Sequence, residues 1–171
     1  MRSAHGVTLI ELLTALALLA ILAAAAAPGF RHMARRAAVL SATHEIMSAL
    51  HSTRAAAITR GQPGIVCVTG TTGTCLNVID RPGDGYLAWL DTGADRGRLD
   101  PRDTVLFRSR LPGRISLRGS RTSVTFWPVS RAGTTNTLSI CDRDAIAAPS
   151  QVIVSQSGRP RLATAPARAC E

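Results

Sequence analysis

Residues 6–30 of the chain read GVTLIELLTALALLAILAAAAAPGF, and this stretch decides how the rest of the molecule is organised. The residues after Gly6 carry a single charge, that of Glu11. As an α-helix with a rise of about 1.5 Å per residue, they would span the roughly 30 Å of hydrocarbon in a bilayer. The sequence therefore predicts a membrane-spanning helix over residues 7–30.

Glu11 is the unusual residue of this helix. An ionised side chain near the middle of a membrane costs on the order of 3 kcal/mol, so it normally has a partner of opposite charge. No Lys or Arg lies between Val7 and Phe30. Cleavage between Gly6 and Val7 would create such a partner, because the new α-amino group would lie one helical turn from Glu11 and could pair with it within one chain or between neighbours.

The motif GVTLIEL resembles the cleavage site of type IV pilins and type II secretion pseudopilins. In that family a short polar leader ends in Gly, and an apolar helix follows with Glu at its fifth mature position. The resemblance implies that residues 1–6 are a leader removed by a prepilin peptidase. It implies that Val7, where the family usually has Phe, becomes the N-methylated first residue. It also implies that the helix, with Glu11 and a frequent kink at Pro28, assembles with other pilins into a filament.

Two other interpretations of the N-terminus compete with this one. A secretory signal peptide would use Arg2 as its basic start and the alanines of residues 23–27 as its cleavage region, but Glu11 argues against it. A plain membrane anchor leaves Glu11 unexplained. More arginines follow the helix than precede it, and a positive-inside count alone would place the rest of the chain in the cytoplasm. The cysteines and the resemblance favour a bacterial inner-membrane protein with its C-terminal domain in the periplasm.

Beyond the leader and the anchor, about 140 residues remain, enough for one domain with a core. The formal net charge of +9 would suit an acidic partner such as nucleic acid. However, all 20 basic residues are Arg, which indicates that genome base composition accounts for part of the excess.

Residues 31–60 continue the helical pattern as an amphipathic helix. Apolar side chains recur at steps of three, four and seven, and we expect this stripe, which His44 and Arg54 interrupt, to cover a sheet. Gly61 and Pro63 are expected to end the helix. The stripe consists of Phe30, Met33, Ala37, Leu40, Met47, Leu50 and Ala57.

Residues 61–171 read as a β-rich domain of short strands and turns, each strand bounded by Gly, Pro, Asp or Asn. The expected fold class is therefore α+β: a long N-terminal helix packed on an antiparallel sheet or sandwich. The expected strands are residues 65–69, 75–79, 86–90, 104–108, 114–118, 123–127, 137–141 and 151–155.

The four cysteines all lie beyond the anchor, and an even number of them is typical of an oxidising compartment. Of the three ways to pair them we favour Cys67–Cys75 with Cys141–Cys170. The runs on either side of residues 70–73 could fold as a hairpin that brings Cys67 opposite Cys75. No Cys/His spacing favours zinc.

Motifs for catalysis or metal binding are weak. The aspartates of residues 91–103 suggest a calcium loop, which needs an acid at its third position, a glycine at its sixth and an acid at its twelfth. Counting from Asp91, these positions hold Gly93, Arg96 and Arg102, so we favour a turn. His44 does not begin a zinc-protease helix, because the second histidine would have to fall at Ser48. We therefore expect no enzymatic activity, no cofactor and no metal.

The motif GRPR at residues 158–161 is the sharpest remaining signal. Gly158 allows a turn and Pro160 restrains the backbone, so we expect Arg159 and Arg161 to project from a defined loop at about the spacing of adjacent phosphates. A planar guanidinium suits contact with a nucleic-acid backbone without sequence preference.

The paired-cysteine hairpin, the segment that begins GYLAWLDTG at residue 85 and the late VIVSQSGRPRL with a terminal Cys are similar to the GspH/FimT branch of minor pilins, over nearly the whole chain. GRPR resembles the G-R-x-R of FimT-type pilins. That resemblance implies DNA binding during natural transformation, with Arg168 on a tail that the Cys141–Cys170 bridge would hold. In the alternative interpretation these arginines are ordinary surface residues, paired for example with Asp142 or Asp144. The sequence thus predicts a minor subunit of a type II secretion pseudopilus or a type IV pilus, and leaves DNA uptake as an alternative.

Overall fold

The computed structural model describes residues 8–93, 97–129 and 132–170. The chain divides into two compact units, residues 1–34 and residues 35–171. The long helix α1, Leu9–Arg60, contributes residues to both, as the sequence predicts.

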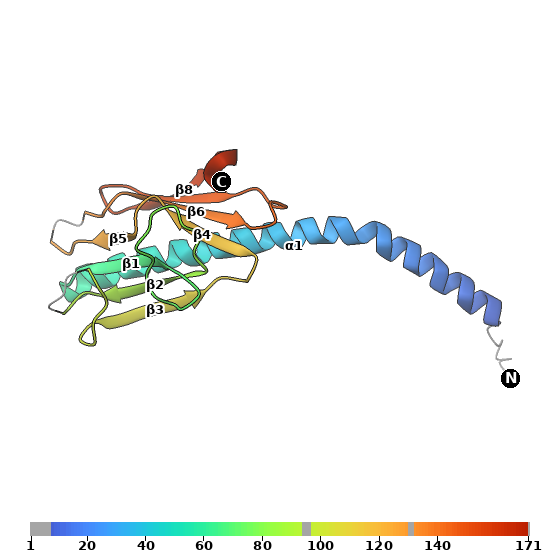
Figure 1. Cartoon of the computed structure of the whole chain (residues 1–171), viewed down its shortest axis with the longest axis horizontal. Helices are drawn as coiled ribbons and strands as arrows, with labels where there is room; N and C mark the ends of the chain where they lie inside the picture. Colours follow the sequence, from blue (N-terminus) through green and yellow to red (C-terminus); the bar gives the residue numbers. More distant parts are fainter. Residues whose placement is uncertain (1–7, 94–96, 130–131, 171) are drawn as a thin grey trace, which may run out of the picture. The chain divides into compact units, whose positions relative to one another are not determined.

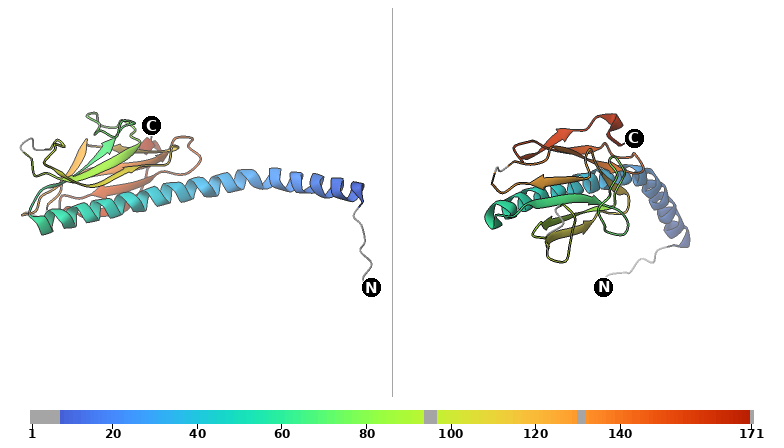
Figure 2. Two further views of the ribbon diagram at one scale, coloured as in Figure 1. Left: turned by 90° about the horizontal axis from the view of Figure 1, so that it is seen from below. Right: turned by 60° about the vertical axis from the view of Figure 1, so that its left-hand side comes forward.

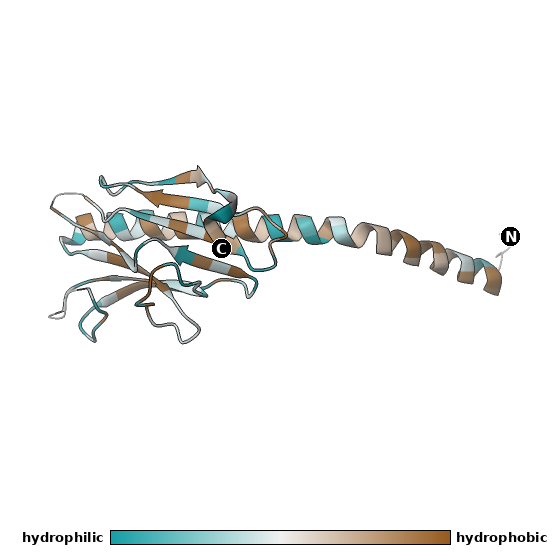
Figure 3. Ribbon diagram, turned by 45° about the horizontal axis from the view of Figure 1, so that its top comes forward, coloured by the Kyte–Doolittle hydropathy of each residue, from teal (hydrophilic) through white to brown (hydrophobic). Residues whose placement is uncertain are grey.

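The N-terminal unit is a helix with an exposed apolar surface. Thr8 caps α1, because its carbonyl accepts the N–H of Leu12 (3.1 Å) and its hydroxyl accepts the N–H of Glu11 (3.3 Å). The helix continues through Pro28, which has no N–H to donate to the preceding turn. By length and composition α1 is able to cross a membrane, and apolar colours dominate its N-terminal half (Figure 3).

The second unit begins within α1, and the face that α1 buries there matches the predicted stripe only in part, since Leu50 and Ala57 are buried and Met47 packs against the core. Leu40 is 56% exposed, and Met33 and Phe30 are exposed in the first unit. The predicted stripe also left out the buried threonines. Thr43 and Thr53 donate their hydroxyls to the carbonyls of the preceding turn (2.7 Å each), which leaves their methyl groups free to pack. The buried residues are Val39, Ala42, Thr43, Ile46, Ala49, Leu50, Thr53 and Ala57.

α1 ends as predicted. Gly61 adopts a left-handed conformation (φ +66°), and the N–H of Gln62 donates to the carbonyl of Ala57 (3.2 Å), which is the pattern of a glycine C-cap. The chain then turns directly into the first strand, where the position of a Cβ on Gly64 would lie 2.9 Å from the side chain of Thr53. Only glycine allows the strand to start so close to the helix.

Two four-stranded antiparallel sheets complete the second unit (Figure 1). The first sheet, in the order β3-β2-β1-β5, contains β1 (Gly64–Thr69), β2 (Gly85–Leu90), β3 (Thr104–Arg110) and β5 (Ser123–Phe126). The second sheet, in the order β4-β6-β7-β8, contains β4 (Ile115–Gly119), β6 (Asn136–Asp142), β7 (Ser150–Val154) and β8 (Pro160–Thr164), and a 3-10 turn, η1 (Ala167–Cys170), follows β8.

Seven of the predicted strands are present, and one is wrong. Residues 75–79 form only an isolated bridge between Cys75 and Thr69, because β5 pairs with β1 from Gly64 to Cys67 and occupies the edge that a hairpin would need. The sequence analysis also missed β8, whose first residue is Pro160. A proline is tolerated there because β8 is the edge strand of its sheet.

The main core lies between the second half of α1 and one face of each sheet (Figure 2). A second cluster, Ile65, Cys67, Leu87 and Trp89 with Cys75 packed against it, fills the other face of the first sheet. Both faces of β1 and β2 are therefore buried, whereas the face of the second sheet that points away from the main core is only partly covered, with Ser116, Ser139 and Cys141 buried and Arg161 exposed. We call this the outer face of the second sheet.

Candidate functional sites

Glu11 lies in the first turn of α1, where its carboxylate is favoured by the positive end of the helix dipole. Its carbonyl accepts the hydroxyl of Thr14 (2.9 Å). The sequence analysis missed the Thr8 cap, although a threonine three residues before a glutamate is the spacing of a capping box. The cleavage residues Gly6 and Val7 lie outside the described residues.

The apolar surface of residues 9–34 needs a covering. Its leucines and isoleucines are more than half exposed, and no residue of the most apolar window of α1 is buried. Small residues interrupt these large ones, which allows another helix to approach closely. They include Ala15, Ala17, Ala20, Ala23 and Ala24. Such a surface fits a membrane or neighbouring helices of the same kind.

The structure contains both expected disulfides. Cys67 and Cys75 are joined with their Cα atoms 5.6 Å apart, and Cys141 and Cys170 are joined at 5.8 Å. The second bond ties η1 to the end of β6, and η1 carries Arg168. The chain after β8 is therefore held against the second sheet.

The GRPR motif forms part of the β7–β8 hairpin and not a free loop. Gly158 takes a left-handed conformation (φ +69°) and donates its N–H to the carbonyl of Ser155 (2.8 Å). Arg159 closes the turn, since its carbonyl accepts the N–H of Ser155 (3.3 Å), and Arg161 lies in β8 opposite Ile153. Both arginines are exposed. Arg159 precedes the first residue of β8, and Arg161 is the second residue of that strand.

Strand register places further polar residues on the same outer face. Arg161 and Ile153 form one row with Thr137 on β6, and the next row contains Arg118, Ser139 and Gln151. The side chains between these rows alternate into the core. A pocket of about 380 Å³ on this face is lined by Arg118 and Arg168.

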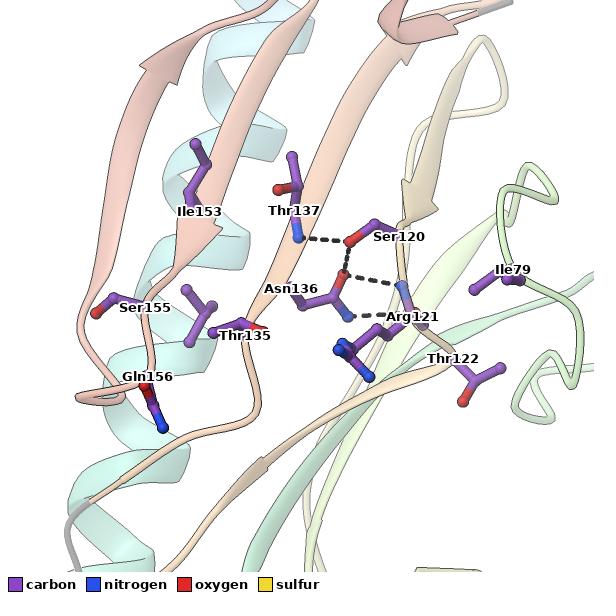
Figure 4. Close-up of a pocket in the computed structure, with 11 residues that line it drawn as sticks. Ile79, Ser120, Arg121, Thr122, Thr135, Asn136, Thr137, Ile153, Ser155 and Gln156 are labelled. Carbon is purple, nitrogen blue, oxygen red and sulfur yellow. Dashed lines mark hydrogen bonds between the residues drawn. The ribbon is translucent and has the colours of Figure 1, made fainter.

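A larger pocket, of about 890 Å³, lies beside the β7–β8 turn and includes Thr137 and Ile153 of the same face (Figure 4). Asn136 organises it by accepting the Ser120 hydroxyl (3.1 Å) and the Arg121 N–H (3.2 Å) on its side-chain oxygen. The residues that line the pocket include Arg121, Ser155 and Gln156 and no aromatic side chain. Its chemistry suits phosphate or hydroxyl groups and not base stacking.

The acids suggested by the sequence as partners of these arginines have other roles. Asp144 pairs with Arg35 (2.8 Å) and Arg114 (3.0 Å). Asp142 accepts backbone N–H groups of the turn that follows β6, including that of Ala147 (3.1 Å). Among the residues that the structure describes, no acid forms an ion pair with Arg159 or Arg161.

The other candidate sites are structural. Asp103 accepts the N–H groups of Thr92 (2.8 Å) and Gly93 (3.0 Å), as expected for a turn. Glu45 accepts the hydroxyl of Tyr86 (3.0 Å), and burial, together with the Glu45 charge, raises the pKa of Tyr86 to about 12. Within the described part of the chain, no three His, Cys, Asp or Glu side chains are grouped to hold a metal.

Comparison with known proteins gives two family matches. Residues 42–158 match the family described as type II transport protein GspH, and residues 1–27 match the prokaryotic N-terminal methylation motif. No curated protein sequence matches the chain significantly.

Solved structures show a similar fold. The type IV minor pilin FimU of Pseudomonas aeruginosa PAO1 is 17% identical over 81% of this chain and 99% of that chain, with a TM-score of 0.55. The minor pseudopilin EpsH of the type 2 secretion system of Vibrio cholerae is 17% identical over 74% of this chain and 96% of that chain, with a TM-score of 0.53. At this level of identity both comparisons show a similar fold.

Proposed function

The chain belongs to the GspH family and is a minor pilin or pseudopilin subunit of a type IV pilus or type II secretion system, and we propose how it enters its filament. A prepilin peptidase cleaves between Gly6 and Val7, Val7 is methylated, and the subunit is assembled through residues 7–30. The exposed apolar surface of α1, with one carboxylate at its start, supports this proposal most strongly.

Membrane and filament provide successive coverings for the same helix. In the inner membrane lipid covers the apolar side chains, and in the filament neighbouring helices replace the lipid. There Glu11 pairs with the α-amino group of Val7 on a neighbour, which offsets the cost of burying either charge. The disulfide-bonded domain, residues 61–171 with the amphipathic helix 31–60, stands in the periplasm, where disulfides persist.

The experiment is to change Glu11 to Gln or Ala and to measure incorporation into sheared filaments. We expect both variants to fold and insert but to be absent from filaments, because only the charge pair is lost. Thr14→Ala, one turn further along the same exposed helix, is the control and should be incorporated normally. Filaments that contain Glu11→Gln at the wild-type level would overturn the charge pair.

Mass spectrometry of the mature chain tests cleavage. Finding residues 1–6 still attached when the peptidase is active would overturn the proposed processing.

The outer face of the second sheet favours a second candidate function, contact with DNA. Arg159 and Arg161 are both exposed at the β7–β8 hairpin, and Asp142 and Asp144 have other partners. Arg121 and Arg168 line pockets on the same face. Two exposed guanidinium groups two residues apart in the chain suit contacts with successive phosphates of one strand. The subunit would then act in DNA uptake as well as in filament structure.

Duplex binding by the full chain in neutral detergent tests this candidate. We expect binding without sequence preference that weakens with salt with a logarithmic slope of about −2 to −4, and that is lost when Arg159 and Arg161 are both changed to Gln. The matched control changes Arg36 and Arg60 on α1 to Gln, which removes the same charge elsewhere. Equal losses in the two double variants would show a nonspecific charge effect, and no binding by the wild type would leave the structural role alone.

A further inference from the structure

Three chain segments at one end of the first sheet surround an open pocket of about 680 Å³. Gly64 at the start of β1 pairs with Leu90 at the end of β2 and with Phe126 at the end of β5. The residues just beyond these positions therefore meet, and the N–H of Asp91 donates to the carbonyl of Pro63 (2.8 Å). The pocket is lined by Gln62, Pro63, Asp91, Thr92, Gly93, Trp127, Pro128 and Val129.

Asp91 places a buried carboxylate at this pocket. The residue is only 9% exposed, and its Oδ2 accepts the N–H of Gly97 (3.0 Å). Its Oδ1 is buried and accepts a hydrogen bond from none of the described residues. Buried carboxylate oxygens normally have a donor, so the charge of Asp91, which lines the pocket, is only partly compensated by the described residues.

The rim of the pocket is apolar and exposed. Trp127 is 45% exposed and Val129 is 96% exposed, although both are large apolar residues. The Trp127 backbone is fixed, because its N–H donates to the carbonyl of Ala132 (3.0 Å) directly after β5. An indole held at the surface beside a carboxylate offers a cation both a π face and an opposite charge.

The described lining of this pocket contains no cationic side chain, although the chain carries 20 arginines. A small inorganic cation would not explain the exposed tryptophan and valine, whereas aromatic and apolar residues around a charged partner are typical of protein interfaces.

We propose that this pocket binds an arginine or lysine side chain presented by another protein subunit. The Asp91 carboxylate attracts the cationic group, Trp127 packs on it, and Val129 covers the flanking residues of the partner. The pocket lies where α1 ends and the first sheet begins, so it is separate from the outer face of the second sheet and from residues 7–30. The proposal goes beyond assembly through α1 and does not depend on it.

The test is a titration of the full chain in neutral detergent micelles with the peptide acetyl-Gly-Arg-Gly-amide. The matched probe is acetyl-Gly-Gln-Gly-amide at the same ionic strength. The readout is the indole N–H resonance of Trp127, which is distinguished from that of the buried Trp89 by a Trp89→Phe assignment variant. We expect saturable shifts with the arginine peptide and binding about fivefold weaker, or absent, with the glutamine peptide.

Asp91→Asn keeps an oxygen for the Gly97 N–H and should weaken arginine binding about fivefold to tenfold. The control Asp80→Asn removes one charge outside the pocket at a position with φ +59°, which asparagine tolerates, and should leave binding unchanged. Equal titrations by the two peptides, or wild-type affinity in Asp91→Asn, would overturn the proposal.

If Asp91→Asn loses the dispersed spectrum of a folded protein, Trp127→Leu replaces it, read on the backbone amide of Gly93. The exposed position of Trp127 makes this change compatible with folding. We expect it to abolish the arginine-dependent shift of Gly93, and a shift of wild-type size and affinity would contradict the role of the indole. Filament incorporation of the same variants is scored separately, so a failed titration leaves the assembly proposal standing.

Discussion

Tyr86 shows how one buried polar side chain connects α1 to the first sheet. It lies on β2 in the main core, and its hydroxyl reaches out of that core to Glu45 on α1, which also accepts the hydroxyl of Ser109 on β3. The pair therefore joins three elements by one carboxylate. Burial and the Glu45 charge both favour the neutral phenol, which is why the pKa of Tyr86 is raised.

Tyr86 is the one tyrosine of the chain, so its titration can be measured directly by absorbance at 295 nm. We expect a pKa of about 12 in the folded protein, against about 10 after unfolding. Because the folded pKa is the higher one, the contribution of the phenol to stability is fully present below pH 10 and is lost as the pH rises through 12.

Glu45→Gln should lower the Tyr86 pKa but leave it above 10, since burial is the larger cause. Tyr86→Phe should remove this part of the pH dependence of the unfolding free energy. A folded-state pKa near 10 in the wild type would contradict the described environment of the hydroxyl.

Single residues were predictable where the chemistry is local. The Cys67–Cys75 pair follows from neighbours in sequence, and the structure contains this bond. The partners of Asp144 were not predictable, because Arg35 lies 109 residues away and only the packed structure brings them together. The open oxygen of Asp91 was missed for the same reason, since the sequence shows an aspartate in a turn and not its burial.

At the scale of elements, α1 was predicted in extent, and its buried face was predicted only in part. The periodicity fixed a long helix ending at Gly61, whereas the choice of face depended on which small and polar residues can be buried. Threonines bonded to their own helix behave as apolar residues there. The exposed apolar residues Met33 and Leu40 lie near the anchor end of the predicted stripe and misled the prediction.

Leu50→Ala and Leu40→Ala together test which residues of the predicted stripe are buried. Leu50 is fully buried in the main core, so its truncation should reduce the unfolding free energy by about 2 to 5 kcal/mol. Leu40 is largely exposed, and its change should cost less than about 0.5 kcal/mol. Urea denaturation followed by circular dichroism measures both. Similar losses at the two positions would show that Leu40 is buried as well, as the stripe predicted from periodicity required.

The β7–β8 hairpin was predicted only as a loop, because a proline and two arginines do not read as a strand. Gly158→Ala tests the observed turn. Its left-handed backbone should make alanine cost about 1 to 2 kcal/mol, and Gly133 packs close to its Cα. Gly113→Ala, where an added Cβ would meet nothing within 4 Å, is the control and should be nearly neutral. Equal stability of the two variants in thermal unfolding would show that the turn differs.

For the whole molecule, the order of one long helix followed by strands determined the fold class, but the sequence could not divide the strands between two sheets. That division depends on long-range pairings such as β1 with β5 and β4 with β6. The charge of the chain behaves similarly. The net charge was visible in the composition, whereas the position of Arg161 on the outer face of the second sheet required the strand register.

The division into two units at residue 35 predicts that stability resides in the second unit alone. A fragment of residues 31–171 keeps Arg35 and its ion pair with Asp144, and it loses a segment whose apolar residues are exposed. We expect this fragment to be soluble without detergent and to unfold in one transition. Its midpoint should lie within about 3 °C of that of the full chain in micelles, since no core residue is removed. Near-ultraviolet circular dichroism of the buried Trp89 reports the packed core, and residues 31–171 with Leu50→Ala provide a destabilised reference. A fragment that aggregates, or that lacks the Trp89 signal, would show that residues 1–30 contribute to the folding of the domain and not only to its assembly.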